Sequence, residues 1–106
     1  MENQHRKIAG YRELSQTEID LMNRIKAKGA EMLDLQAELV DMLKLHEVSK
    51  INAVDSANTN DSEAGAKAEF NRFHAAEPFR WAAIGKTDLQ TGIMALVRAV
   101  AQPAGV

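Results

Sequence analysis

Tyr11 and Lys26 are the two side chains whose type and position indicate a chemical role, the binding of a flat, anionic molecule. Tyr11 is the only tyrosine of the chain and follows Gly10. Two basic residues, Lys7 and Arg12, lie on either side of it. A tyrosine ring can stack on a nucleobase, which contributes about 1 to 3 kcal/mol per base. The alternative is that Tyr11 covers the end of the following helix as an ordinary amphipathic side chain.

Lys26 occupies a position at which the helical pattern calls for an apolar residue. Counting heptads from Ile19 gives one row with Ile19, Lys26, Leu33 and Val40, and a companion row with Met22, Gly29, Gln36 and Leu43. A lysine on such a seam costs stability and is kept for register or for a ligand, and its ammonium suits phosphate. The alternative is that the side chain extends to solvent. Because Gly29 follows on the companion row, the pattern predicts a gap beside a positive charge.

Charge is distributed unevenly along the chain, which has a net charge of -2. Residues 1–28 carry six Lys and Arg against four Asp and Glu, residues 29–66 carry two against eight, and residues 67–106 carry five against three. The pI near 5.9 argues against long nucleic acid as a partner, since such proteins usually have a broad basic face. Arg6 and Arg12 can instead add charge around one small phosphate-bearing ligand, although each alone is also typical of a solvated surface.

No pattern indicates catalysis, a metal site or a cofactor. The three histidines have no metal-ligand spacing, and neither a Walker loop nor GxGxxG occurs. An acidic helix face carries Glu31, Asp34, Glu38 and Asp41. That face lacks the Glu-x-x-His pairs by which helical bundles hold metals, so it is predicted to be solvated. We expect a protein that is not an enzyme and needs no cofactor.

The composition predicts one soluble, all-α domain over residues 1–106. The chain is 45% hydrophobic and 26% charged, with two prolines. It has no cysteine, no apolar run near the ~18 residues that span a membrane, and no signal-peptide pattern, which favours the cytoplasm. Only 5% of the residues are aromatic, so the core of a single chain is thin and association between copies is expected.

Helix signals divide the chain into four elements. Ser15 to Glu18 matches a capping box at the start of a long helix, and Pro78 fits the first turn of another. The expected elements are a short helix over 3–9 ended by Gly10, a long helix from about 16 to 48, a helix from about 61 to 76, and a final helix over 78–102 that Pro103 ends. Residues 49–61 lack periodicity and are rich in Ser, Asn and Asp, which predicts a variable loop.

Two helix surfaces are expected to meet further partners. In the long helix, the apolar residues between 32 and 43 cover about half the circumference, which implies two packing partners. The final helix has an apolar stripe made of Trp81, Gly85, Leu89, Gly92, Ile93, Leu96, Val97 and Val100. Its two glycines would let another helix approach closely. The opposite side carries Arg80, Thr87, Thr91 and Arg98, which form either a second polar site or a solvated face.

Two sequence blocks resemble a known family. The pattern HRxIxGYRxLxxxEIxLMNxIK in residues 5–26, followed by RWAAIGKTDLQTGIMALVRAVAQP in residues 80–103, is similar to the bacteriophage anti-CBASS family of cyclic-oligonucleotide sponges. The second block also resembles the wider group that includes the anti-Thoeris sponges, so the first block is the more specific one. Together the blocks cover somewhat under half of the chain.

The resemblance implies a small helical protein that assembles as a homohexamer, a trimer of dimers, in the cytoplasm of a bacterial host. Such a protein binds cyclic dinucleotides such as 3',3'-cGAMP without cleaving them and so keeps immune effectors inactive. In the family, a tyrosine stacks on a base and a lysine meets the phosphates in a pocket between two protomers. The matching positions and their candidate neighbours here are Tyr11, Lys26, Arg6, Lys7, Gly10 and Arg12.

Other ligands and roles stay open at this stage. Some members of the family hold cyclic trinucleotides at separate sites, for which Lys67 and Arg72 are the candidates here. One alternative is a sponge for the cyclic ADP-ribose-like signals of Thoeris. Another, of a different class, is a structural helical oligomer that binds no ligand.

Overall fold

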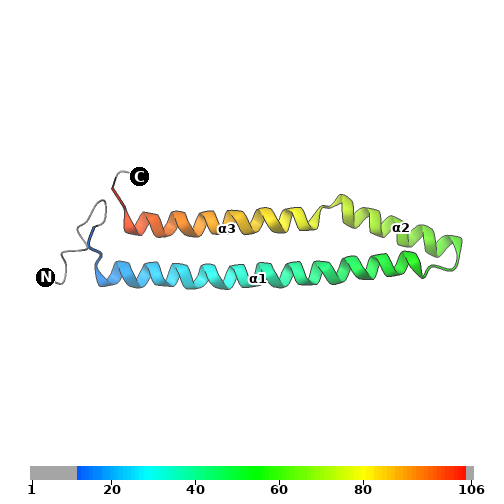
Figure 1. Ribbon diagram of the computed structural model, residues 1–106, viewed down its shortest axis with the longest axis horizontal. Coiled ribbons are helices and arrows are strands. Elements are labelled where there is room, and N and C mark those ends of the chain that lie inside the picture. The colour runs from blue at the N-terminus through cyan, green and yellow to red at the C-terminus, as the bar shows by residue number, and fades with distance from the viewer. Residues whose placement is uncertain (1–11, 105–106) are drawn as a thin grey trace. The chain divides into compact units, whose positions relative to one another are not determined.

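The computed structural model describes residues 12–104, and these form three helices: α1 (Gln16–Asp55), α2 (Asn60–Ala75) and α3 (Pro78–Ala101) (Figure 1). The all-α class, the single long helix and the two C-terminal helices are thereby confirmed. The short helix expected over 3–9 lies outside the described residues. None of the three helices combines the length and the apolar character needed to cross a membrane.

The start of α1 follows the predicted capping box. The Ser15 hydroxyl accepts a hydrogen bond from the Glu18 amide at 3.2 Å, and the Glu18 carboxylate accepts one from the Ser15 amide at 2.9 Å. Two of the amides that a helix N-terminus leaves without partners are satisfied in this way. α2 begins with the same arrangement, in which Thr59 is the N-cap and Ser62 returns the bond.

The predicted loop over 49–61 is wrong for most of its length. Residues 49–55 continue α1, residues 60 and 61 belong to α2, and only 56–59 are not helical. The helix continues because Lys50 and Val54 extend the seam and are both partly buried. The Lys50 ammonium lies 5.4 Å from the centre of the Phe73 ring and 3.6 Å from a Glu69 oxygen. Because a charged residue, Lys50, occupies a seam position, the apolar heptad pattern is not visible in this part of the sequence.

The break between α2 and α3 is a backbone turn immediately before Pro78. Glu77 has a positive φ of 51°, and its amide donates to the His74 carbonyl at 3.1 Å. A left-handed residue at this place is a common way to end a helix, although a residue other than glycine pays a steric cost. Pro78 then begins α3, as predicted. α3 ends at Ala101, and Gln102, with φ 50°, precedes Pro103.

The helices form two compact units that we describe separately. In the described part of the first unit, residues 12–33 pack against residues 87–104. The second unit comprises residues 34–86. Its core contains Leu43, Phe73 and Ala82, of which Phe73 is only 4% exposed, with partly buried residues Val40 and Phe79 packed against it. Gln36, a polar residue on the seam, is partly buried. Its side-chain amide donates a hydrogen bond to the Ala82 carbonyl at 3.0 Å, and this bond offsets the cost of burying the polar group.

Burial along α1 confirms the predicted seam. Among the two heptad rows, Gly29 and Leu43 are buried, and Lys26 alone is exposed.

The stripe predicted for the final helix needs correction, because Ala82 is buried whereas Trp81 is 58% exposed. Within the described chain, nothing lies within 4 Å of a Cβ placed on Gly85 or Gly92. Close approach of a helix at these two glycines therefore stays a prediction about another copy.

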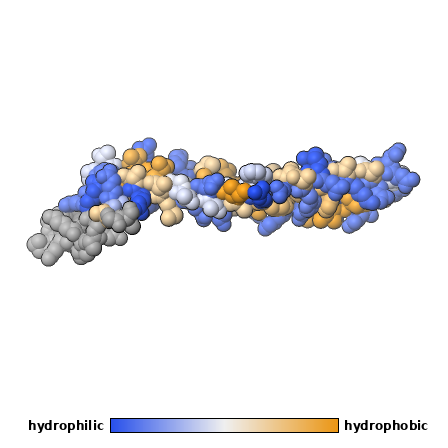
Figure 2. Space-filling view, turned by 90° about the horizontal axis from the view of Figure 1, so that it is seen from above, coloured by the Kyte–Doolittle hydropathy of each residue, from blue (hydrophilic) through white to orange (hydrophobic). Residues whose placement is uncertain are grey.

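Large apolar side chains remain at the surface of each unit. Leu21 and Leu96 are 45% and 56% exposed in the first unit, and Leu35 and Met42 are 57% and 44% exposed in the second. Figure 2 shows hydrophobic residues reaching the surface at several places between hydrophilic ones. The further packing partner that the width of the apolar arc on the long helix implies therefore stays a prediction.

Candidate functional site

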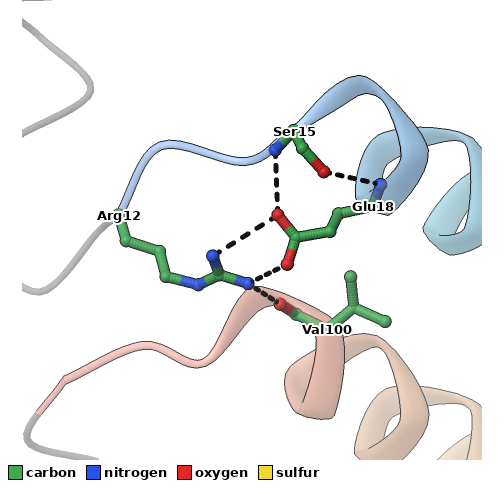
Figure 3. A network of polar contacts seen from close by, with 4 residues as sticks. All are labelled: Arg12, Ser15, Glu18 and Val100. Atoms are coloured by element: carbon green, nitrogen blue, oxygen red, sulfur yellow. Dashed lines mark hydrogen bonds and ion pairs between the residues drawn. The ribbon is translucent and has the colours of Figure 1, made fainter.

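The N-terminal end of the first unit is held together by a network around Glu18 (Figure 3). The Arg12 guanidinium donates to the Glu18 carboxylate at 2.5 Å and to the Val100 carbonyl, near the end of α3, at 2.7 Å. The same carboxylate also takes part in the capping bonds with Ser15. One carboxylate thus joins the segment before α1 to the end of α3 through Arg12.

The network has a clear electrostatic consequence. Hydrogen bonds from Arg12, followed by the bond from the Ser15 amide, lower the pKa of Glu18 from 4.5 to about 2. Both kinds of bond stabilise the ionised carboxylate. Arg12 was predicted to help neutralise phosphate, but the structure places its guanidinium against Glu18. Its distal nitrogen atoms are therefore already engaged.

Lys26 is a seam residue whose side chain is exposed. It lines a groove of about 610 Å³ together with residues of α3 and the segment after it, namely Thr91, Ile93, Met94, Ala95, Val97, Arg98 and Pro103. The lining is mainly apolar, with Lys26 and Arg98 as its two charged members. Within residues 12–104, neither of these two cations forms an ion pair. The groove therefore has a mainly apolar lining and two cations that carry no ion pair within the described part of the chain.

Gly29 does not leave a gap, contrary to the sequence-based expectation. It is buried, and a Cβ placed on it would lie 2.5 Å from Ile93 Cδ1 and 2.7 Å from Cγ1. The missing side chain of Gly29 makes room for Ile93 of the same chain. Ile93 thus fills the space directly over Gly29, while Gly29 also lines the neighbouring groove between α1 and α3.

A second groove, of about 500 Å³, lies between α1 and α3 in the same unit. Its lining is dominated by the apolar side chains Leu21, Ile25, Met32, Leu89, Ile93 and Leu96, and Arg24, Lys28 and Glu31 also contribute. By heptad position, its α1 residues lie on the opposite flank of the seam from Lys26. Ile93 lines both grooves, since it fills the contact between the two helices.

The candidates for a second nucleotide site, Lys67 and Arg72, belong to α2 in the second unit. Lys67 is 2.7 Å from Glu63, one helical turn earlier. Arg72 forms an ion pair with Glu69, which lowers the pKa of Glu69 to about 2. Both cations are thus paired with carboxylates of their own helix. Their role in a second nucleotide site stays a prediction.

Four of the predicted site residues, Arg6, Lys7, Gly10 and Tyr11, lie outside the described part of the chain. Their roles stay predictions. Thr91 and Arg98 were predicted as part of a separate polar site or of a solvated face, whereas the structure places them beside Lys26. The register of α3 against α1 brings the three together. The sequence did show that no acidic residue lies near Arg98 on its helix. It did not show that Arg98 shares a groove with Lys26.

Comparison with known proteins identifies the family to which this helical chain belongs. Residues 4–101 match a family model described as "Acb2/Tad1, hairpin domain". The chain belongs to this family. It is similar over its whole length to Anti-CBASS protein 2 of Pseudomonas phage JBD67, with 60% identity over 107 residues and 99% of each chain covered. The resemblance first seen in residues 5–26 and 80–103 is thereby confirmed.

Proposed function

We propose that this protein inhibits CBASS immunity by binding and sequestering cyclic dinucleotides such as 3',3'-cGAMP in the cytoplasm of a bacterial host. Membership of the Acb2/Tad1 family and the 60% identity to a phage Anti-CBASS protein 2 support this function. The observation that carries it on this chain is Lys26, an exposed cation on an otherwise apolar seam, free of any ion pair in residues 12–104. An ammonium in that position is available to a phosphate.

The proposed mechanism is sequestration without a chemical step. Tyr11 stacks on a base, Lys26 meets a phosphate, and Arg6, Lys7 and Gly10 complete the surroundings of the ligand. Arg12 serves this site mainly by anchoring the segment before α1, because its guanidinium is bound to Glu18 and to the end of α3. Inhibition then depends on affinity and on the number of copies, so we propose that the protein is not an enzyme.

Assembly is the second part of the proposal. We place the protein in a homohexamer, a trimer of dimers, whose ligand pockets lie between protomers. The apolar groove beside Leu21 and Leu96 and the exposed apolar residues of α1 support association, because single chains rarely leave so much apolar surface uncovered. Light scattering is expected to report six protomers, and a monomer would refute the assembly.

Calorimetry with 3',3'-cGAMP tests the function, followed by chromatography of the nucleotide recovered from the complex. The parent protein is expected to bind and to release the nucleotide intact. Tyr11→Ala and Lys26→Ala should each weaken binding by about tenfold or more, through loss of base stacking and of a charged contact respectively, without changing the assembly. Lys44→Ala, which removes an exposed lysine of the same helix outside the groove, is the control. Absence of binding by the parent would refute the function, and a linear product would reveal an enzyme.

Two other ligands are tested in the same experiment. The family model names Tad1 beside Acb2, which supports a cyclic ADP-ribose-like signal of Thoeris as the alternative ligand. A cyclic trinucleotide would bind at a separate site, for which Lys67 and Arg72 are the candidates. Lys67→Ala with Arg72→Ala should weaken trinucleotide binding alone. A protein that bound none of these ligands would be a structural helical oligomer.

A further inference from the structure

The groove that contains Lys26 has a second cation, Arg98, from the last turn of α3. Arg98 is exposed and, like Lys26, has no carboxylate partner among residues 12–104. The other arginines of α2 and α3 differ in this respect, since Arg72 is paired with Glu69 and Arg80 with Glu77. Arg98 is therefore available to an anion from outside the chain.

The remaining lining of the groove fits the other parts of a nucleotide. Met94 and Val97 form an apolar floor on α3, and Met94 is 71% exposed. Thr91 adds one hydroxyl on the same helix, at the opposite end of this stretch from Arg98. A flat base can pack on such a floor, while phosphates need positive donors at its edge. No carboxylate is among the described residues that line this groove, so these residues contribute positive charge only.

A bland explanation for Arg98 is that it stabilises the end of its helix. A positive charge in the last turn interacts favourably with the helix dipole. That role requires no groove and no neighbouring lysine, and a lysine would serve equally well. Arg98 of α3 and Lys26 of α1 line one groove, and this favours a ligand over the explanation by the helix dipole alone.

We propose that Arg98 is a second phosphate-binding residue of the Lys26 groove, so that the two phosphates of a cyclic dinucleotide are met by cations from α1 and α3. This inference rests on the proposed function. It adds Arg98 of α3 to the binding site and predicts a preference for ligands with two phosphates. A molecule with two phosphates held apart by its ring satisfies both cations at once. A mononucleotide satisfies only one and should bind more weakly.

Calorimetry with 3',3'-cGAMP on three variants tests the role of Arg98. Arg98→Gln is expected to weaken binding by about tenfold or more, the effect of losing a hydrogen bond to a charged group. Arg98→Lys keeps the charge and should stay within about threefold of the parent. Lys86→Gln removes another unpaired cation of α3, outside the groove, and should not change the affinity. If Arg98→Gln bound like the parent, or if Lys86→Gln weakened binding as much, the role of Arg98 would be refuted.

Chemical footprinting supplies a measurement on the unmodified protein, which avoids any effect of a variant on folding. Phenylglyoxal modifies accessible arginines, and mass spectrometry reports each site. Saturating 3',3'-cGAMP should protect Arg98 and leave Arg80 as reactive as before. Equal modification of Arg98 with and without bound nucleotide would overturn the inference while leaving the proposed function intact. Failure of the parent to bind would instead refute the proposed function itself.

Discussion

Replacement of Gly29 by alanine tests the contact on which the first unit depends. In an ordinary helix interior, glycine to alanine stabilises by about 0.5 to 1 kcal/mol. At Gly29, however, the new Cβ would lie 2.5 Å from Ile93 Cδ1 and 2.7 Å from Cγ1. Favourable carbon contacts are about 3.5 to 4.0 Å long, so Ile93 must move by roughly an ångström.

The expected cost follows from these distances. Overpacking of this kind costs about 1 to 3 kcal/mol, which outweighs the gain in helix propensity. We expect Gly29→Ala to lower the free energy of unfolding by about 1 kcal/mol and the Tm by about 5 °C. Thermal unfolding followed by circular dichroism measures this, at one protein concentration because association shifts the Tm.

A double substitution makes the prediction sharper, because it reverses the sign. Ile93→Ala removes all three atoms that crowd the new methyl group. On that background, Gly29→Ala should stabilise by about 0.5 to 1 kcal/mol. Gly65→Ala is the matched control, since Gly65 is helical and has nothing within 4 Å of its Cβ position. If Gly29→Ala stabilised the parent as much as Gly65→Ala does, the packing of Ile93 on Gly29 would be wrong.

Three further predictions concern single side chains. Because the pKa of Glu18 is lowered from 4.5 to about 2, its ionised form stabilises the protein above about pH 4.5, and this contribution is lost as the pH falls toward 2. The Tm difference between the parent and Glu18→Gln should therefore be larger at pH 7 than at pH 3, and an unchanged difference would contradict the network in Figure 3. Thr59→Ala should cost about 1 kcal/mol in urea unfolding, since the Thr59 side chain caps α2, whereas Thr87→Ala, which removes no cap, should cost less. Phe73→Ala should cost about 3 kcal/mol or more because the ring is 4% exposed, and a loss below that of Thr59→Ala would contradict the small core.

The helix boundaries illustrate how far local chemistry carries. The capping box at Ser15 and Glu18, the turn before Pro78 and the heptad rows of α1 were all readable from the sequence. Residues 49–55 were not, because the seam there uses Glu47 and Lys50, whose polar side chains interrupt the apolar period. Lys50 contacts Phe73 and Glu69 of α2, and Glu47 lies 3.6 Å from His74 of the same helix, all of which are far away in the sequence.

The candidate site shows the same division. An odd lysine on an apolar row and the family pattern of residues 5–26 singled out Lys26 without any coordinates. The partners of Lys26 could not be found in that way, because they come from a different helix. The sequence pattern places Arg98 and Thr91 on a separate polar face and predicts open space at Gly29, where Ile93 packs in the structure.

The sequence by itself determined most of the helical residues and where most helices begin, because caps, prolines and heptad spacing act over only a few residues. The blocks in residues 5–26 and 80–103 also indicated the family to which the chain is similar. Only the tertiary structure decided which side chains share a groove. That outcome depends on the register between α1 and α3, and the packing of Ile93 against Gly29 contributes to this register. In that register Arg98 lies in the same groove as Lys26, and neither cation forms an ion pair within residues 12–104.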